Sequence, residues 1–288
     1  MSPSRLSIPV APHLARWTRV PAWTLALAWA LGGAAMAQTS APPGAPGVAD
    51  AFEGDPFRSL PWVDMRREYL GPQAQVRWEA RVRVQGPDFA EDPMNVPIHV
   101  QVDPALGPVR QITVLVDRNP IRRVVDYFPV QALPSLSFRF KLEQASPVRA
   151  AVQTADGVWH VGGTWVESAG GGCTVSGATR KDGSWSQTLG EVSGRLFSGL
   201  PEGAGAASRL RLRVMHPMDT GLVGGIPAFF VNRLSVRDAQ DRELARLHSY
   251  EPVSENPVFS FDFAQPPAGG VRIVGSDNNG NRITSRLE

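Results

Sequence analysis

The sequence predicts an all-β protein made of two antiparallel β-sandwich domains joined by a glycine-rich linker. Residues 76–84 alternate apolar or small side chains with charged ones, so one face of a strand is buried and the other meets water. The same alternation recurs at 210–214 and 259–263. Turn-forming pairs such as Gly86-Pro87 and Asn279-Gly280 separate these runs. About 230 residues remain after the amino-terminal segment, which fits two sandwiches of about seven strands each.

Residues 1–37 have the features of a secretory signal peptide. Arg16 and Arg19 precede the apolar run 22–31, and Ala35-Met36-Ala37 supplies a small-residue cleavage site. The apolar run is shorter than the roughly 20 residues that cross a membrane. We therefore expect a soluble periplasmic protein that begins near Gln38.

A flexible lead-in, residues 38–59, is expected to follow the signal peptide, because its Pro- and Gly-rich start cannot form a core. The whole chain has 29 Lys and Arg against 27 Asp and Glu, but the predicted signal peptide holds Arg5, Arg16 and Arg19 and no acid. The mature chain thus has 26 basic and 27 acidic residues, and its arginines are scattered. This balance indicates neither a nucleic-acid nor a membrane partner.

The domain boundaries follow from a change in composition. Strand-like sequence extends over 60–168, apart from a short helical pattern at 61–69, and it resumes over 193–288. The segment between them, 169–192, is dominated by Gly, Ser, Thr and Ala and is predicted to be the linker.

The only cysteine of the chain, Cys173, lies in this linker directly after Gly170, Gly171 and Gly172. In an oxidising compartment an unpaired cysteine indicates a reactive thiol or an intermolecular bond. Three glycines have no side chains to pack and leave the backbone free to move. We therefore expect an exposed thiol on a flexible arm, with a chance cysteine in a disordered linker as the alternative.

Other catalytic or metal-binding patterns are not evident. His99, His160 and His248 show no metal-ligand spacing, and the sequence has no phosphate-binding loop or G-x-S-x-G nucleophile elbow. His216 precedes a proline and is predicted to be a turn element rather than a base or a metal ligand. We expect no enzyme activity, no cofactor and no metal site.

Two groups of motifs follow one another along the chain. The first group is Ala90-Glu91-Asp92, Val96-Pro97-Ile98, Arg118-Asn119-Pro120, Asp156-Gly157 and Gly171-Gly172-Cys173. The second group is His216-Pro217-Met218-Asp219-Thr220-Gly221, Ile226-Pro227, Ser254-Glu255-Asn256-Pro257 and Asp277-Asn278-Asn279-Gly280. The first group resembles SoxY and the second resembles SoxZ, so the chain resembles the SoxYZ sulfur carriers, and more closely the fused SoxYZ-like carriers associated with quinoprotein dehydrogenases. The resemblance covers roughly residues 75–285, and the string 216–221 is its most specific element.

The resemblance implies two immunoglobulin-like β-sandwiches that pair within the chain. It also implies that Cys173 carries sulfur covalently between enzymes, on the arm formed by Gly170, Gly171 and Gly172. The motif 216–221 is then a structural element or a partner contact. Partners implied are periplasmic redox proteins: Sox-type or c-type cytochrome enzymes, or a quinoprotein dehydrogenase. Unlike the family's glycine-flanked terminal cysteine, Cys173 is internal and is followed by Thr174 and Val175.

Three functional hypotheses follow from the sequence. The first is a covalent sulfur carrier that uses Cys173. The second is a non-catalytic adaptor or maturation partner of a PQQ-dependent quinoprotein alcohol dehydrogenase. The third, disfavoured by the wide sequence separation, is a redox protein or metallochaperone that uses Cys173 with Met215, Met218 and His216.

Overall fold

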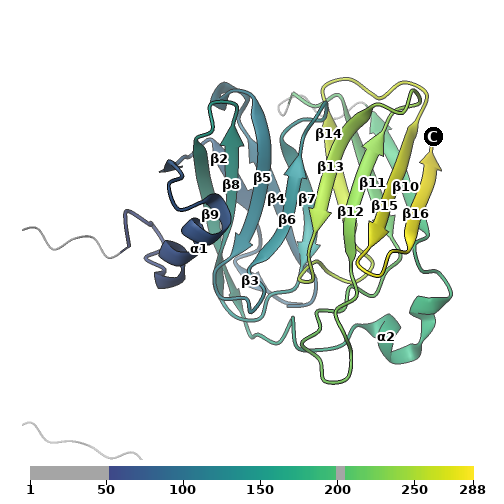
Figure 1. Cartoon of the computed structure of the whole chain (residues 1–288), viewed down its shortest axis with the longest axis horizontal. Coiled ribbons are helices and arrows are strands. Elements are labelled where there is room, and N and C mark those ends of the chain that lie inside the picture. The colour runs from purple at the N-terminus through teal and green to yellow at the C-terminus, as the bar shows by residue number, and fades with distance from the viewer. Residues whose placement is uncertain (1–51, 199–204) are drawn as a thin grey trace, which may run out of the picture. The chain divides into compact units, whose positions relative to one another are not determined.

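The computed structural model describes residues 52–198 and 205–288, and within these ranges the protein is built almost entirely of β-strands (Figure 1). The predicted signal peptide and most of the predicted lead-in lie outside the described residues. The all-β prediction is confirmed. Among the described helices, none is long and apolar enough to cross a membrane.

The strands form two sheets. The ten-stranded sheet has the order β1 (Val76–Trp78), β9 (Trp159–Ser168), β8 (Ser146–Thr154), β5 (Val109–Val116), β6 (Arg123–Phe128), β13 (Glu243–Ser249), β12 (Val231–Arg237), β15 (Val271–Asp277) and β16 (Arg282–Leu287), with β3 (Phe89–Ala90) paired to β9. The six-stranded sheet has the order β10 (Val192–Ser198), β11 (Ser208–Val214), β14 (Val258–Phe263), β7 (Ser135–Phe140), β4 (Val96–Val102) and β2 (Val82–Gln85). Strand pairs are antiparallel, except that β1 and β3 pair with β9 in parallel.

The first half of the chain supplies β1–β9, the second half supplies β10–β16, and both sheets run through both halves. In the ten-stranded sheet β6 pairs with β13, and in the six-stranded sheet β7 pairs with β14. The described residues, 52–198 and 205–288, consequently belong to one compact unit instead of two bodies held by a linker. The predicted pairing of the two halves within the chain is confirmed, and it takes place strand to strand.

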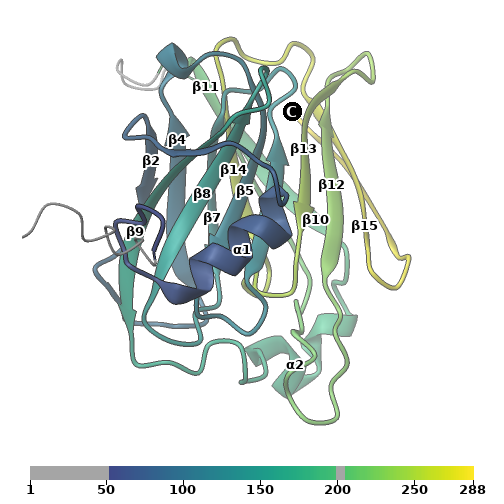
Figure 2. The ribbon, with the colours of Figure 1, turned by 60° about the vertical axis from the view of Figure 1, so that its left-hand side comes forward.

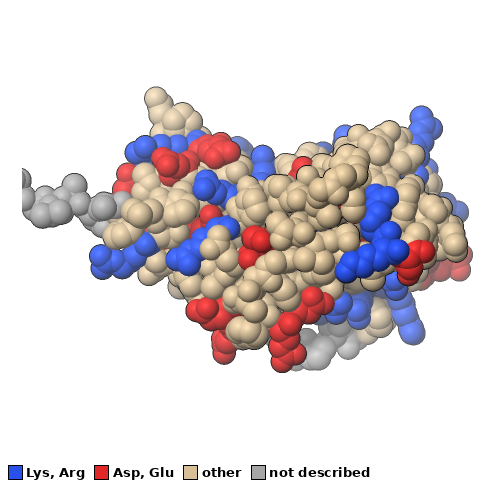
Figure 3. Space-filling view, turned by 90° about the horizontal axis from the view of Figure 1, so that it is seen from below, with Lys and Arg blue, Asp and Glu red and all other residues tan. Residues whose placement is uncertain are grey.

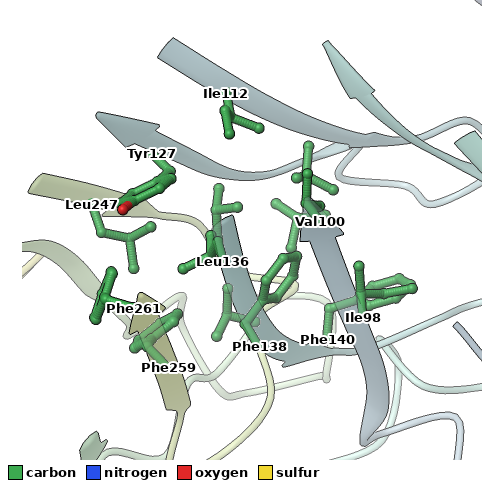
Figure 4. Packing of buried hydrophobic residues seen from close by; sticks show 14 of the residues in the cluster. Ile98, Val100, Ile112, Tyr127, Leu136, Phe138, Phe140, Leu247, Phe259 and Phe261 are labelled. Atoms are coloured by element: carbon green, nitrogen blue, oxygen red, sulfur yellow. The ribbon is translucent and has the colours of Figure 1, made fainter. Parts of the chain in front are cut away.

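One hydrophobic core lies between the two sheets and crosses the junction of the halves. Figure 4 shows side chains from both halves packed together, among them Tyr127 and Leu136 against Phe261. The predicted alternation explains this core, because in β11 the residues of one parity are buried and those of the other are exposed or half-buried. Tyr127 and Phe261 bring their ring centroids to 5.7 Å across the junction.

Short helices complete the structure. The predicted helix is present as α1 (Leu60–Leu70), with Pro61 in its first turn. It lies across the outer face of the ten-stranded sheet over β8 (Figure 2), where Trp62 and Met65 pack in a second apolar cluster. Elsewhere are the short helices η1 (Pro104–Leu106), α2 (Ala178–Asp182) and η2 (Ser184–Ser186).

The end of the predicted lead-in is packed rather than flexible. Asp55 is buried, and its carboxylate pairs with the fully buried guanidinium of Arg149 at 2.7 Å, which also binds Asp117. The Arg149 guanidinium carbon lies 4.4 Å from the centroid of the Trp62 ring. The flexibility expected for the whole of 38–59 is thus wrong for residues 52–59, because composition does not reveal that one carboxylate has a distant buried partner.

We expect Arg149→Met to lower the free energy of unfolding by about 3–5 kcal/mol, because it leaves the carboxylates of Asp55 and Asp117 buried without their cation. The matched control is Arg237→Met, which breaks the surface pair with Asp241 and should cost less than about 1 kcal/mol. Urea unfolding at neutral pH measures both. An equal loss of unfolding free energy in the two variants would show that the buried ion pairs of Arg149 with Asp55 and Asp117 do not hold residues 52–59.

Candidate functional site

The glycine segment before Cys173 packs against residues 141–143, which follow β7. The Gly171 N–H donates to the Glu143 carbonyl at 3.0 Å, and the Gly172 N–H donates to the Leu142 carbonyl at 3.2 Å. A Cβ on Gly172 would lie 2.2 Å from the carbonyl oxygen of Pro93, so only glycine fits at this position. The absence of side chains serves close packing of two backbones here, not mobility.

Cys173 is buried, with 1% of its surface exposed. Its N–H donates to Glu143 Oε2 at 2.8 Å, and its carbonyl accepts a hydrogen bond from Thr220 Oγ1 at 2.7 Å. Its Sγ lies 3.5 Å from the Lys141 carbonyl oxygen. The predicted exposure of the thiol is therefore wrong. The cysteine is fixed between residues 141–143 of the first half and the 216–221 motif of the second, which together form what we call the seat of Cys173.

Lys141 makes a further link between the halves beside the thiol. Its side chain is buried, and its Nζ donates to the carbonyl oxygen of Met218. Met218 adopts a left-handed backbone conformation, with φ 49°, which is unusual for a residue other than glycine. Burial lowers the pKa of Lys141, while Cys173, Asp219 and Glu255 act in the opposite direction.

Asn119, from the motif 118–120, holds the chain on which Cys173 sits. Its Nδ2 donates to the Lys141 carbonyl, and its Oδ1 accepts from the Glu143 N–H, both at 2.8 Å. This side chain bonds to the backbone on both sides of Leu142, so it fixes residues 141–143 past the end of β7.

The thiol of Cys173 is strongly biased to its neutral form. Burial raises its pKa to about 12, the carboxylate of Glu143 adds to this effect, and the charge of Lys141 opposes it. Because the thiolate is the nucleophile, the seated cysteine is unreactive at neutral pH.

The 216–221 motif is a structural segment, buried over residues 216–220, that carries Thr220 and Met218 to Cys173 and Lys141. His216 Nδ1 accepts the Met218 N–H at 3.1 Å, while Nε2 faces Asp277 Oδ2 at 3.5 Å. The centroid of the His216 ring lies 4.4 Å from that of the Phe229 ring. Burial lowers the pKa of His216 to about 4. His216 is thus a neutral turn residue, as the sequence indicated.

Comparisons with known proteins agree with the division of the chain into two halves. Residues 66–173 match the family described as "Sulfur oxidation protein SoxY", and residues 201–288 match the family described as "Sulphur oxidation protein SoxZ". Cys173 is the last residue of the SoxY match. The chain belongs to the SoxYZ sulfur carrier family, with both partners fused. SoxY and SoxZ are non-catalytic, so the chain is a carrier-family protein and not an enzyme.

Solved structures show weaker similarity. The sulfur carrier protein SoxY from Chlorobium limicola f thiosulfatophilum is 17% identical, with a TM-score of 0.33, over 36% of this chain and 88% of that one. A superoxide reductase (neelaredoxin) from Ignicoccus hospitalis is 18% identical, with a TM-score of 0.27, over 34% of this chain and 96% of that one. A search of curated proteins found no match.

The segment predicted to be the linker between the SoxY and SoxZ halves is anchored along its course. The Thr179 N–H at the start of α2 donates to Glu255 Oε1 at 2.8 Å, and Arg180 pairs with Asp219. Gly177 faces the Glu255 carboxylate so closely that a Cβ would lie 2.1 Å from Oε2. The SoxZ motif 254–257 therefore binds the linker as well as leading into β14.

The structure brings together Cys173, its three glycines and the 216–221 motif, a grouping that the sequence analysis did not predict. It does not form the soft metal site of the third hypothesis: Met218 Sδ accepts the Val231 N–H at 3.3 Å. Within 52–198 and 205–288, no three His, Cys, Asp or Glu side chains are grouped as metal ligands.

Lys141 and Glu143 are site residues that sequence reasoning missed. Strand alternation gives no signal for Lys141, because this residue has the parity of the exposed Arg139 and lies between Phe140 and Leu142, whose parity is the buried one. Its burial depends on a distant partner, the Met218 carbonyl.

We expect Thr220→Val to speed native-state alkylation of Cys173 by iodoacetamide about fivefold, because it removes one hydrogen bond, worth about 1 kcal/mol, from the seat. Thr284→Val, a matched change at an exposed position of β16, should leave the rate unchanged. Intact mass against time measures the rate. Equal rates for Thr220→Val and wild type would show that this bond does not keep the thiol closed.

Proposed function

We propose that this protein is a periplasmic carrier that binds a sulfur intermediate covalently on Cys173 and presents it to partner redox enzymes. One observation carries the proposal: the sole cysteine ends the SoxY match and lies at the junction of the SoxY and SoxZ halves. The predicted signal peptide supports the compartment. Sox-type or c-type cytochrome enzymes, or a quinoprotein dehydrogenase, are the partner classes that fit a secreted carrier.

The chemistry requires only a presented thiolate on the carrier. Joining the Cys173 sulfur to an anionic sulfur species as a disulfide-type bond releases two electrons and the thiol proton. The two electrons pass to an oxidising partner enzyme, and later thiol exchange or hydrolysis frees the cargo. No base on this chain takes part, which agrees with the structural role of His216.

Presentation requires the segment around Cys173 to leave its seat. Opening breaks the bonds of the Gly171, Gly172 and Cys173 N–H groups and the bond from Thr220 to the Cys173 carbonyl. It also separates the Cys173 Sγ from the Lys141 carbonyl and Thr174 Oγ1 from Glu143. At a net value of about 1 kcal/mol each, the first four bonds alone keep the open fraction well below about 1%. The sandwich itself loses no strand when the segment opens.

The burial of Cys173 favours a second candidate function. A thiol with 1% exposure is also what an adaptor or maturation partner of a PQQ-dependent quinoprotein alcohol dehydrogenase would have, since its cysteine need not react. In that case the two sandwich halves provide binding edges, and the cysteine serves only packing.

Intact mass of the protein purified without reductant from its own periplasm tests the carrier function. We expect a fraction with added sulfur mass that reductant removes, and none in Cys173→Ser. The Ser variant should fold, because it keeps every backbone bond of the seat. A Cys173→Ser strain that oxidises its sulfur substrate like wild type would contradict the carrier function and leave the adaptor function.

A further inference from the structure

The outer face of the six-stranded sheet carries a hollow of about 730 Å³ that spans the junction of the SoxY and SoxZ halves. Its lining comes from strands β2, β4 and β7 of one half and β10, β11 and β14 of the other. The lining residues include three arginines, Arg139, Arg209 and Arg211, and no Asp or Glu. A hollow of one charge sign attracts ligands of the other.

Strand register arranges the polar lining in a line. Arg211 lies opposite Ser260, Ser260 opposite Ser137, and Ser137 opposite His99. His99 Nδ1 and Ser137 Oγ are 2.9 Å apart. This row crosses four strands, from β11 to β4, so the hollow is long enough for an extended segment.

The arginines of the hollow differ in their internal partners. Arg209 is committed to Asp262, with Nε 2.6 Å from Oδ1. In contrast, neither Arg139 nor Arg211 forms an ion pair with any residue that the structure describes, and both are exposed. Two guanidinium groups at one hollow are therefore free to bind carboxylates from outside.

Apolar surface lies among these charges. Phe197 of β10 is a large hydrophobic side chain with 40% of its surface exposed, and Pro97 lies opposite Arg139 on the neighbouring strand. The lining thus mixes apolar and cationic positions. An extended segment that mixes acidic and apolar side chains complements both.

The hollow opens next to the seat of Cys173. Arg139 precedes Lys141 by two residues on the same chain, and the Ser254 N–H donates to the Arg139 carbonyl at 3.1 Å beside the seat. At the end of the molecule that carries α2, acidic and basic groups are mixed (Figure 3). Charge of a single sign thus distinguishes the hollow from the adjoining end.

We propose that this hollow docks an extended acidic segment of the partner protein, with its carboxylates on Arg139 and Arg211, and so places the partner beside the Cys173 seat. The inference rests on the proposed function for the existence of a partner, and not on any reaction of the thiol. Docking at the junction also requires both halves, since each supplies one of the two free arginines.

A labelled peptide tests the docking surface without the thiol. The probe is a fluorescein-labelled peptide of four Glu-Val repeats, titrated by anisotropy at low ionic strength into the Cys173→Ser protein. We expect Arg139→Glu/Arg211→Glu to weaken binding at least tenfold. The matched control, Arg110→Glu/Arg233→Glu, changes the net charge equally at exposed positions of β5 and β12 and should leave the affinity within about twofold.

His99 provides a second readout that does not depend on mutation. Its ring resonances should shift as the peptide is added, whereas those of His248 on the other sheet should not. A Gln-Val peptide should shift neither. Arg139→Gln/Arg211→Gln keeps the side chains polar and should weaken binding in the same direction if the Glu variant does not fold.

Three outcomes would overturn the docking proposal. One is equal weakening in the two double-Glu variants, which would show attraction by net charge alone. Another is peptide binding with no shift of His99. The last is a His99 shift caused by phosphatidylglycerol vesicles or by a thymidine decanucleotide but not by the peptide. Because the thiol is absent, these results leave the mass test of the carrier function unaffected.

Discussion

Strand pairing across the junction of the two halves is the interaction on which the rest of the structure depends. The pairs β6·β13 and β7·β14 extend both sheets through the whole molecule, so the apolar faces of both halves bury one another in a single core. Because β7 leads directly into Lys141, the same pairing brings the end of that strand to the 216–221 turn. The SoxY and SoxZ halves thereby build the cysteine site jointly, and neither half has it alone.

The site holds the Cys173 thiol buried and neutral. Backbone bonds and one threonine hydroxyl close the segment, and burial keeps the thiol protonated. The bonds are local, so opening does not disturb the sandwich. Under the proposed function, a partner bound at the arginine-lined hollow would meet the cysteine when its segment opens.

Much of the fold was predictable from the sequence because strands with one buried face have a period of two, and α1 begins with a proline in its first turn. The pairing of the two halves within the chain also followed from the resemblance. Three features of the structure could not be predicted from the sequence. Glycines before Cys173 are equally suited to a mobile arm and to close backbone packing, and only a distant partner such as the Pro93 carbonyl decides between them. Lys141 and Asp55 find their partners across long sequence separations, which no local pattern contains.

The most direct test of local opening is the dependence of Cys173 alkylation on urea, compared with global unfolding followed by tryptophan fluorescence. Local release exposes little new surface, so the alkylation rate should be nearly independent of urea at low concentrations, and the opening free energy should be well below that of unfolding. An alkylation rate that rises with the full unfolding m-value from zero urea upward would contradict the account. The thiol would then be reached only when the joined sandwich unfolds.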